Sequence, residues 1–165
     1  MTILGIDPGY AIIGFGLIQG NRAQQSLVQY GAIRTEAGER LSARLRQIYK
    51  DITLLIEQFQ PDAVAVEEIF FHTNVTTALG VAHARGVLLL AAETLQVPLF
   101  EYTPLQVKLA VSGYGRASKA QMMDMVRRHL KLQENPKPDD AADALAVALC
   151  HMRSSAQLLK LGGRN

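Results

Sequence analysis

Three stretches at the start of the chain have the short apolar runs and flanking turn residues that are typical of β-strands. They cover residues 2–7, 12–19 and 26–35. Pro8-Gly9 follows the first stretch and Gly20-Asn21 follows the second, and both pairs favour turns. Because strands joined by such short turns pair with each other, the sequence predicts an antiparallel meander of three strands.

After this meander the apolar residues change to the three- and four-residue spacing of amphipathic helices. The first helix is followed by a buried apolar run, and a buried strand after a helix indicates a parallel crossover. Gly80 and Gly86 are points at which the second helix could break. The elements predicted here are helices at 39–59 and 74–95 and strands at 63–67 and 97–102.

Two further helices are marked by reciprocal capping patterns at their starts. Thr103 stands three residues before Gln106, and Ser118 stands three residues before Gln121. In each pair the hydroxyl and the amide side chain can satisfy each other's backbone N–H groups. The second of these helices is expected to end near Leu130.

A final helix is predicted to start at a capping Asp139 or Asp140, with Asp139 preferred, and to end near Arg153. A flexible tail is expected from about residue 154. The order of elements predicts an α/β fold with a mixed five-stranded sheet, an antiparallel meander plus parallel strands, flanked by helices.

The composition is that of an ordinary globular protein. Of 165 residues, 48% are hydrophobic and 19% are charged, which excludes a mainly disordered chain, and the length favours one domain, residues 1–165. The longest apolar run, 86–92, is far shorter than the ~20 residues of a membrane span. A single cysteine, Cys150, excludes an internal disulfide bond and a thiolate zinc site. We therefore expect a reduced, cytoplasmic protein without membrane contact.

Charge is distributed unevenly along the chain. Residues 1–101 contain seven Lys/Arg and ten Asp/Glu, whereas residues 102–165 contain ten and five. A basic C-terminal part suggests a polyanionic partner, although a solvated basic surface would give the same count. Lys108, Arg116 and Lys119 lie around the flexible segment Gly113–Gly115, where cations can reach phosphates. The sequence leaves open whether the later cations contact a partner or only water: Arg127, Arg128 and Lys131.

Four carboxylates stand at the boundaries of apolar elements. Asp7 and Glu67 each end a buried strand, and Asp140 and Asp143 share one face of the last helix because they are three residues apart. Each of them alone is equally compatible with a turn, a strand end or a helix cap. Converging carboxylates with no nearby Lys or Arg would repel one another in a low dielectric.

A hard divalent cation removes this repulsion, because Mg²⁺ takes oxygen ligands from a few carboxylates. Two such ions about 3.5–4 Å apart can activate a water and stabilise the leaving oxygen in phosphoryl transfer. The sequence therefore predicts a metal-dependent phosphoryl-transfer site. The histidines have no metal-ligand spacing, and no P-loop or nucleophile elbow is present.

The strings ILGIDPG, VAVEEIF, HARG at 83–86 and DAADALA occur in this order along nearly the whole chain. Together they resemble RuvC, the bacterial Holliday-junction resolvase family of the RNase H-like superfamily. The resemblance implies a homodimeric endonuclease that makes paired symmetric nicks in four-way DNA junctions during recombination and repair, leaving 5′-phosphate ends. It also implies Mg²⁺, two ions per site, with Mn²⁺ as a substitute, and the RuvA and RuvB branch-migration complex as partner.

Matched position by position, the family's four catalytic, metal-binding acids correspond to Asp7, Glu67, Asp140 and Asp143. Phe70 corresponds to an aromatic residue that contacts bases near the junction centre, although it could equally be a core residue. Lys108 and Lys119 correspond to positions that approach DNA, and we add Arg116 from the charge pattern. Glu68 and Asp139 are extra acids beside the matched ones, and strand alternation allows only one of Glu67 and Glu68 to face Asp7.

Three other functions remain open at this point. A DNA-binding module without catalysis would bind junctions but would not nick them in Mg²⁺. A nuclease of the RNase H type would prefer an RNA–DNA hybrid or a linear duplex. An actin-like phosphotransferase would use Asp7-Pro8-Gly9 as a phosphate loop, but the chain is too short for two lobes.

Overall fold

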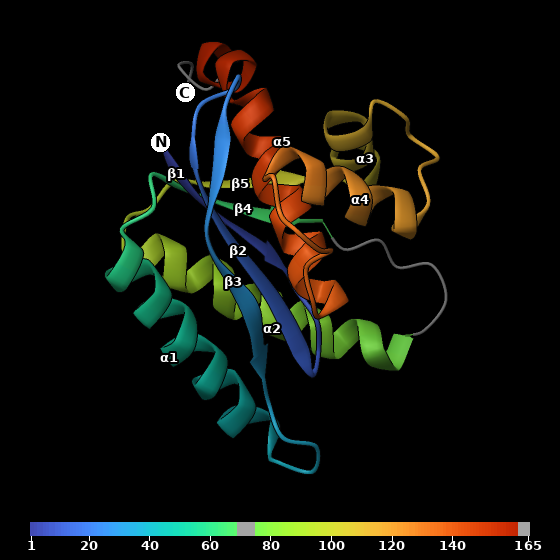
Figure 1. Cartoon of the computed structure of the whole chain (residues 1–165). Helices are drawn as coiled ribbons and strands as arrows, with labels where there is room; N and C mark the ends of the chain where they lie inside the picture. Colours follow the sequence, from blue (N-terminus) through green and yellow to red (C-terminus); the bar gives the residue numbers. More distant parts are fainter. Residues whose placement is uncertain (69–74, 162–165) are drawn as a thin grey trace.

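The structure is a computed structural model that describes residues 1–68 and 75–161. Its centre is one five-stranded sheet with the strand order β3-β2-β1-β4-β5 (Figure 1). The predicted mixed five-stranded sheet is thereby confirmed. The strands are β1 (Thr2–Asp7), β2 (Ile12–Gly20), β3 (Gln25–Arg34), β4 (Ala63–Glu67) and β5 (Leu99–Tyr102).

The pairing within the sheet is antiparallel on one side of β1 and parallel on the other. β1 pairs with β2, and β2 with β3, in antiparallel fashion, which confirms the predicted meander. β1 and β4, and then β4 and β5, run parallel, as the alternation of helices and strands indicates. Because parallel strands end at the same edge, the last residues of β1 and β4 come together there.

Five helices surround the sheet in the described part of the chain. The second is continuous, so neither Gly80 nor Gly86 breaks it. The last helix continues beyond its expected end at Arg153, because no glycine or proline follows before Gly162. The helices are α1 (Leu41–Phe59), α2 (Val75–Thr94), α3 (Pro104–Ser112), α4 (Lys119–His129) and α5 (Asp139–Leu161).

The two faces of the sheet are covered by different helices, α1 and α2 on one and α3, α4 and α5 on the other (Figure 1). Strand alternation supplies each face with apolar side chains, for example Leu4 toward α1 and α2 and Ile3 toward α5. Both side chains are fully buried. The sheet is thus the middle layer of three.

Glycines in β1 and β2 allow α5 to lie directly on the sheet. A Cβ atom at Gly5 would overlap the backbone oxygen of Ala144, and a Cβ atom at Gly14 would overlap that of Asp140. Gly14 is also the residue that pairs with Asp7. The close approach therefore fixes the first turn of α5 beside the end of β1.

The predicted cap of α5 is wrong. Asp139 is already helical, and the carbonyl of Pro138 accepts the N–H of Ala141 at 3.0 Å, so that Pro138 takes the place before the helix. The Asp139 carboxylate instead lies 3.3 Å from the Lys119 ammonium. An ion pair with a neighbouring helix has replaced the local hydrogen bond that the sequence suggested.

Within residues 1–68 and 75–161, no helix combines the length and the apolar character needed to cross a lipid bilayer.

Candidate active site

Asp7 and Glu67 lie at the same edge of the sheet, each as the last residue of its strand. The charge of Glu67 raises the pKa of Asp7, whereas Glu68 makes no such contribution. Glu68 donates its backbone N–H to the carbonyl of Tyr102 at 2.8 Å. The structure therefore brings Glu67, rather than its neighbour, together with Asp7.

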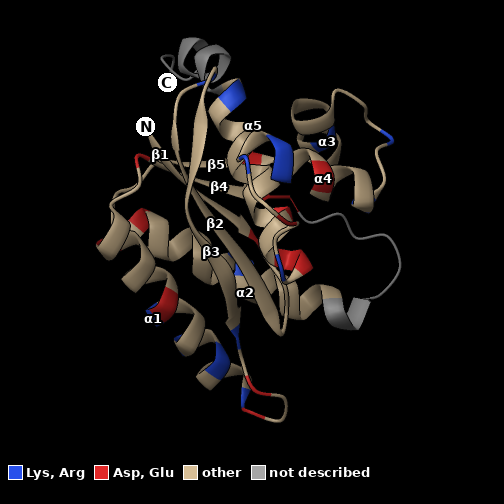
Figure 2. Ribbon diagram, in the orientation of Figure 1, with Lys and Arg blue, Asp and Glu red and all other residues tan. Residues whose placement is uncertain are grey.

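The first turns of α5 bring the other two predicted acids to this edge. Asp140 and Asp143 lie three residues apart in α5, whose backbone at Asp140 rests on Gly14, the strand partner of Asp7. The charges of both acids act on the Asp7 carboxyl group. Four carboxylates from three separate parts of the sequence thus share one region (Figure 2 shows acidic positions at the start of α5).

Electrostatics at this edge disfavour the ionised form of the two strand-end acids. Burial raises the pKa of Asp7 from 3.8 to about 7, and Glu67, Asp143 and Asp140 add to the rise. Burial, followed by the charge of Asp143, raises the pKa of Glu67 from 4.5 to about 7. The protein itself therefore balances the negative charge of the site only in part.

Lys119 partly offsets this excess, and its position contradicts the expectation that no cation lies near the acids. Its ammonium group is 3.2 Å from Asp143 and 3.3 Å from Asp139. Lys119 is the first residue of α4. The capping box at Ser118 fixes the start of this helix and thereby the backbone position of Lys119. The sequence points to DNA alone as the partner of Lys119, because nothing in it shows that α4 lies beside α5.

A hollow of about 220 Å³ opens beside these groups. Glu67 and Asp143 contribute the acids, Lys108 and Lys119 the cations, and Val107 and Met122 an apolar wall. Lys108 also lowers the pKa of Glu67, against the effect of burial. The hollow therefore contains both carboxylates, which can bind a metal, and ammonium groups, which can bind a phosphate.

The donor set fits a hard divalent cation by its chemistry. The site offers carboxylate oxygens, which Mg²⁺ and Mn²⁺ accept, and Lys108 and Lys119 compensate their charge only in part. As the side chains stand, however, no group of three Asp, Glu, His or Cys residues in the described ranges is arranged to hold one ion. Asp143 is turned toward Lys119, so binding of an ion at all four acids requires a change of side-chain rotamers.

The structure describes one of the two other residues predicted to contact DNA, Arg116, but not Phe70. Arg116 is exposed in the turn between α3 and α4. This turn is hydrogen-bonded, since the Ser112 hydroxyl donates to the Lys108 carbonyl at 2.8 Å and accepts from the Tyr114 N–H at 3.2 Å. Phe70 lies outside the described residues.

Comparison with known proteins decides the family. The family model "Crossover junction endodeoxyribonuclease RuvC" matches residues 3–151. The chain belongs to the RuvC family. A RuvC from Desulfitobacterium hafniense is 54% identical over 163 residues, 99% of both chains, and one from Moorella thermoacetica is 56% identical over 151 residues, 92% of this chain and 90% of the relative.

Solved RuvC structures agree with the fold described above. Thermus thermophilus RuvC superimposes with a TM-score of 0.88 at 38% identity, covering 95% of this chain and 96% of the other. The same protein in complex with a Holliday junction substrate gives a TM-score of 0.87 at 34% identity, with the same coverage. The predicted RuvC family, RNase H-like fold and crossover junction endonuclease activity are thereby confirmed.

Proposed function

We propose that this enzyme resolves four-way DNA junctions with Asp7, Glu67, Asp140 and Asp143 as its catalytic, metal-binding residues. One observation carries the proposal: the partly buried Asp7 carboxyl group, with a pKa raised to about 7, lies among the charges of the other three acids. Such a cluster is costly for a protein unless a cation is bound there. A single RNase H-like domain, residues 1–165, would perform the whole reaction.

The acids would hold Mg²⁺, two ions per site, or Mn²⁺ in its place. When bound, such ions activate water and stabilise the leaving oxygen of a phosphodiester. The chain's own contribution is to fix Asp7 and Glu67 on rigid strands and to bring Asp140 and Asp143 against them. The reaction is hydrolysis, in which water adds to phosphorus and the 3′-oxygen leaves with a proton, so that a 5′-phosphate end remains.

Lys108 and Lys119 would position the DNA backbone at the reacting phosphate. Both ammonium groups line the same hollow as Glu67 and Asp143. A phosphate oxygen entering the hollow offers Lys119 an acceptor in place of the Asp143 carboxylate, which is then free to bind a metal. Arg116 and Phe70 remain proposals for contacts farther along the DNA.

A second copy of the chain would supply the second nick, because two equivalent cuts related by a two-fold axis require two equivalent sites. The exposed side of α2 supports this dimer. Leu79, His83, Gly86 and Leu90 are exposed at spacings of four, three and four residues, as in the seam of a helix pair. Leu79 is 61% exposed and Leu90 is 57% exposed.

Three small residues of α2, Gly80, Ala84 and Gly86, differ in whether a second copy can reach them. Gly80 is buried against the Tyr10 ring, and Ala84 is buried in the core, so both pack within the chain. A Cβ atom at Gly86 would meet nothing within 4 Å. Of these three, only Gly86 remains available to a second copy.

The dimer can be tested with Leu90→Glu, which we expect to give a monomer by equilibrium sedimentation and to abolish paired nicking. Leu54→Glu is the matched control, because Leu54 is 50% exposed on α1 and lies outside the α2 seam. A Leu90→Glu protein that remains dimeric would show that α2 is not the interface.

We further place the enzyme in the cytoplasm, with the RuvA and RuvB complex as partner, by family resemblance.

The decisive experiment incubates the protein with a synthetic immobile four-way junction, a linear duplex and an RNA–DNA hybrid, each with and without Mg²⁺. We expect symmetric nicks in the junction, in Mg²⁺ only. Junction binding without nicking would indicate the binding module, and preferred cleavage of the hybrid would indicate an enzyme of the RNase H type.

A further inference from the structure

The helices α4 and α5 contact each other both near their starts and farther along, and cations collect at the later contact. Lys119 pairs with Asp143 at their starts, whereas His129 contacts Arg153 near the other end. The far end, which we call the basic end, is separated from the acids by the length of α4. The basic end consists of Arg22, Arg127, Arg128, Lys131 and Arg153.

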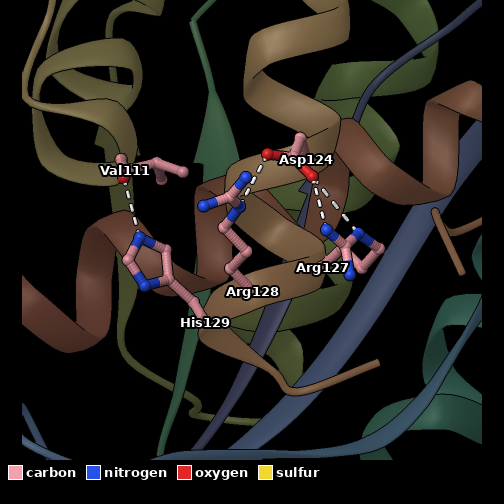
Figure 3. Close-up of polar contacts among 5 residues, drawn as sticks. All are labelled: Val111, Asp124, Arg127, Arg128 and His129. Carbon is pink, nitrogen blue, oxygen red and sulfur yellow. Dashed lines mark hydrogen bonds and ion pairs between the residues drawn. The ribbon is translucent and has the colours of Figure 1, made fainter. Parts of the chain in front are cut away.

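Asp124 organises two of these cations (Figure 3). Its carboxylate accepts from Arg127 at 2.6 Å and from Arg128 at 2.7 Å, each through a different oxygen. Within the described ranges, no other carboxylate forms an ion pair with the five cations. The basic end is therefore a cluster of positive charge with one shared counter-ion.

Arg153 is held in place by the backbone of α3. Its guanidinium donates to the Ala110 carbonyl at 3.0 Å and to His129 Nδ1 at 2.8 Å. His129 Nε2 in turn donates to the Val111 carbonyl at 2.8 Å (Figure 3). Because α3 also carries Lys108, this helix connects the basic end with a cation of the hollow beside the acids.

The turn between β2 and β3 adds a further cation to this end. Burial lowers the pKa of Arg153, and the positive charge of the nearby Arg22 lowers it further. Arg22 is exposed, and no carboxylate in the described part of the chain pairs with it. Two guanidinium groups that repel each other at a surface are stabilised by an anion, as the four carboxylates are by a cation.

A polar hollow of about 460 Å³ adjoins the basic end. Lys131 forms part of its wall, and the residues that surround it include Gln19, Asn21, Gln24 and Ser26, with no acid. Amide and hydroxyl groups are the neutral partners that phosphate and sugar oxygens find in protein–DNA contacts. The shape and chemistry of this end thus suit a sugar–phosphate backbone.

We propose that the basic end binds the sugar–phosphate backbone of a junction arm, away from the bond that is cut. This inference rests on the proposed function, which places the reacting phosphate at the acids. The eleven residues of α4 span roughly 16 Å at about 1.5 Å per residue. At about 3.4 Å per base pair, this is roughly five base pairs along the arm. The basic end would hold the arm and would not take part in the chemistry.

The test removes three exposed cations that have no role in the core: Arg22→Gln, Arg128→Gln and Lys131→Gln in one variant. The matched control removes three exposed cations near α1: Arg34→Gln, Arg46→Gln and Lys50→Gln. Junction affinity is measured without Mg²⁺ over a range of salt concentrations. We expect the basic-end variant to lose about 2–3 from the slope of log K against log salt, at about 0.9 per phosphate, while the control keeps the wild-type slope.

A second readout locates the contact on the DNA. Neutral methylphosphonate linkages about four to seven base pairs from the junction centre should weaken binding of the wild type but not of the basic-end variant. Cleavage of fully bound junction, followed in a single turnover, should be unchanged in the variant.

Two results would overturn the inference: equal loss of slope in the variant and the control, or full sensitivity of the variant to the neutral linkages. The proposed function has a separate failure, in which the wild type does not nick the junction at all.

Discussion

The two ends of the α4–α5 pair have charge of opposite sign and differ in exposure. At the start of α5, carboxylates are partly buried and repel one another, so that burial and like charge raise the Asp7 pKa to about 7. At the other end, cations lie near the surface, and Asp124 is their one ion-paired counter-ion in the described chain. Buried like charge calls for a small, strongly bound metal ion, whereas exposed like charge suits a long, salt-sensitive polyanion.

Asp7→Asn tests the four carboxylates that meet at the start of α5, and it has the largest expected effect. Cleavage of a four-way junction should fall by about 10³-fold or more, equivalent to about 4 kcal/mol of transition-state stabilisation. Junction affinity should persist, because the substitution removes a negative charge near DNA. Single-turnover cleavage and a binding titration measure the two quantities, and a variant that cuts at the normal rate would refute the assignment.

Lys119→Gln tests whether the cation that pairs with Asp143 acts in cleavage or only in folding. We expect single-turnover cleavage to fall by about 100-fold, as for loss of one charged donor at a reacting phosphate. Thermal stability should change little, because the ammonium is exposed and its ion pairs are partly solvated. The matched control is Lys50→Gln on α1. Equal cleavage by both variants would show that Lys119 does not contact the reacting phosphate.

The pH dependence of folding tests the electrostatics of Asp7 in the metal-free protein. The folded-state pKa of Asp7, about 7, exceeds its ordinary value of 3.8, so the folded state holds this proton more tightly. The free energy of unfolding should therefore fall as the pH rises from about 4 to about 7. About 1.4 kcal/mol per unit of pKa difference is the upper limit of this fall, because Asp7 is only partly buried. Asp7→Asn should flatten this profile and raise the melting temperature at pH 8. A wild-type profile that rises over this range would contradict the account.

Arg128→Gln alone should give the smallest effect. Removal of one phosphate-binding cation from the basic end lowers the salt slope of junction binding by about 0.9 and leaves cleavage of bound DNA unchanged. Asp124 then keeps its bond to Arg127, so the helix should remain folded. Binding titrations at several salt concentrations measure the slope, and a reduced cleavage rate at saturating protein would place Arg128 in the active site instead.

Local signals in the sequence are sufficient to predict much of the fold. The capping boxes at Thr103 and Ser118 involve residues only three apart, and both form as predicted. The parallel direction of the strands that end at Asp7 and Glu67 follows from the helix between the meander and β4, which needs only the order of elements. For the same reason the two strand-end acids can be placed at one edge from the order of elements alone.

The features that the sequence does not reveal depend on contacts between distant elements. Lys119 lies 24 residues before Asp143, and only the docking of α4 on α5 brings them together. The same ion-pair network draws Asp139 away from its expected capping role. The basic end joins Arg22 of the β2–β3 turn with Arg153 of α5, which no periodicity or motif connects.

The central claim is that the four carboxylates form a site for divalent cations. Calorimetric titration of Mn²⁺ into the DNA-free protein at pH 7 tests it most directly. We predict saturable binding by the wild type with release of protons, because Asp7 and Glu67 have pKa values of about 7 and bind metal only when ionised. Asp7→Asn should lose this binding. Equal binding by both proteins, or none by either, would contradict the claim.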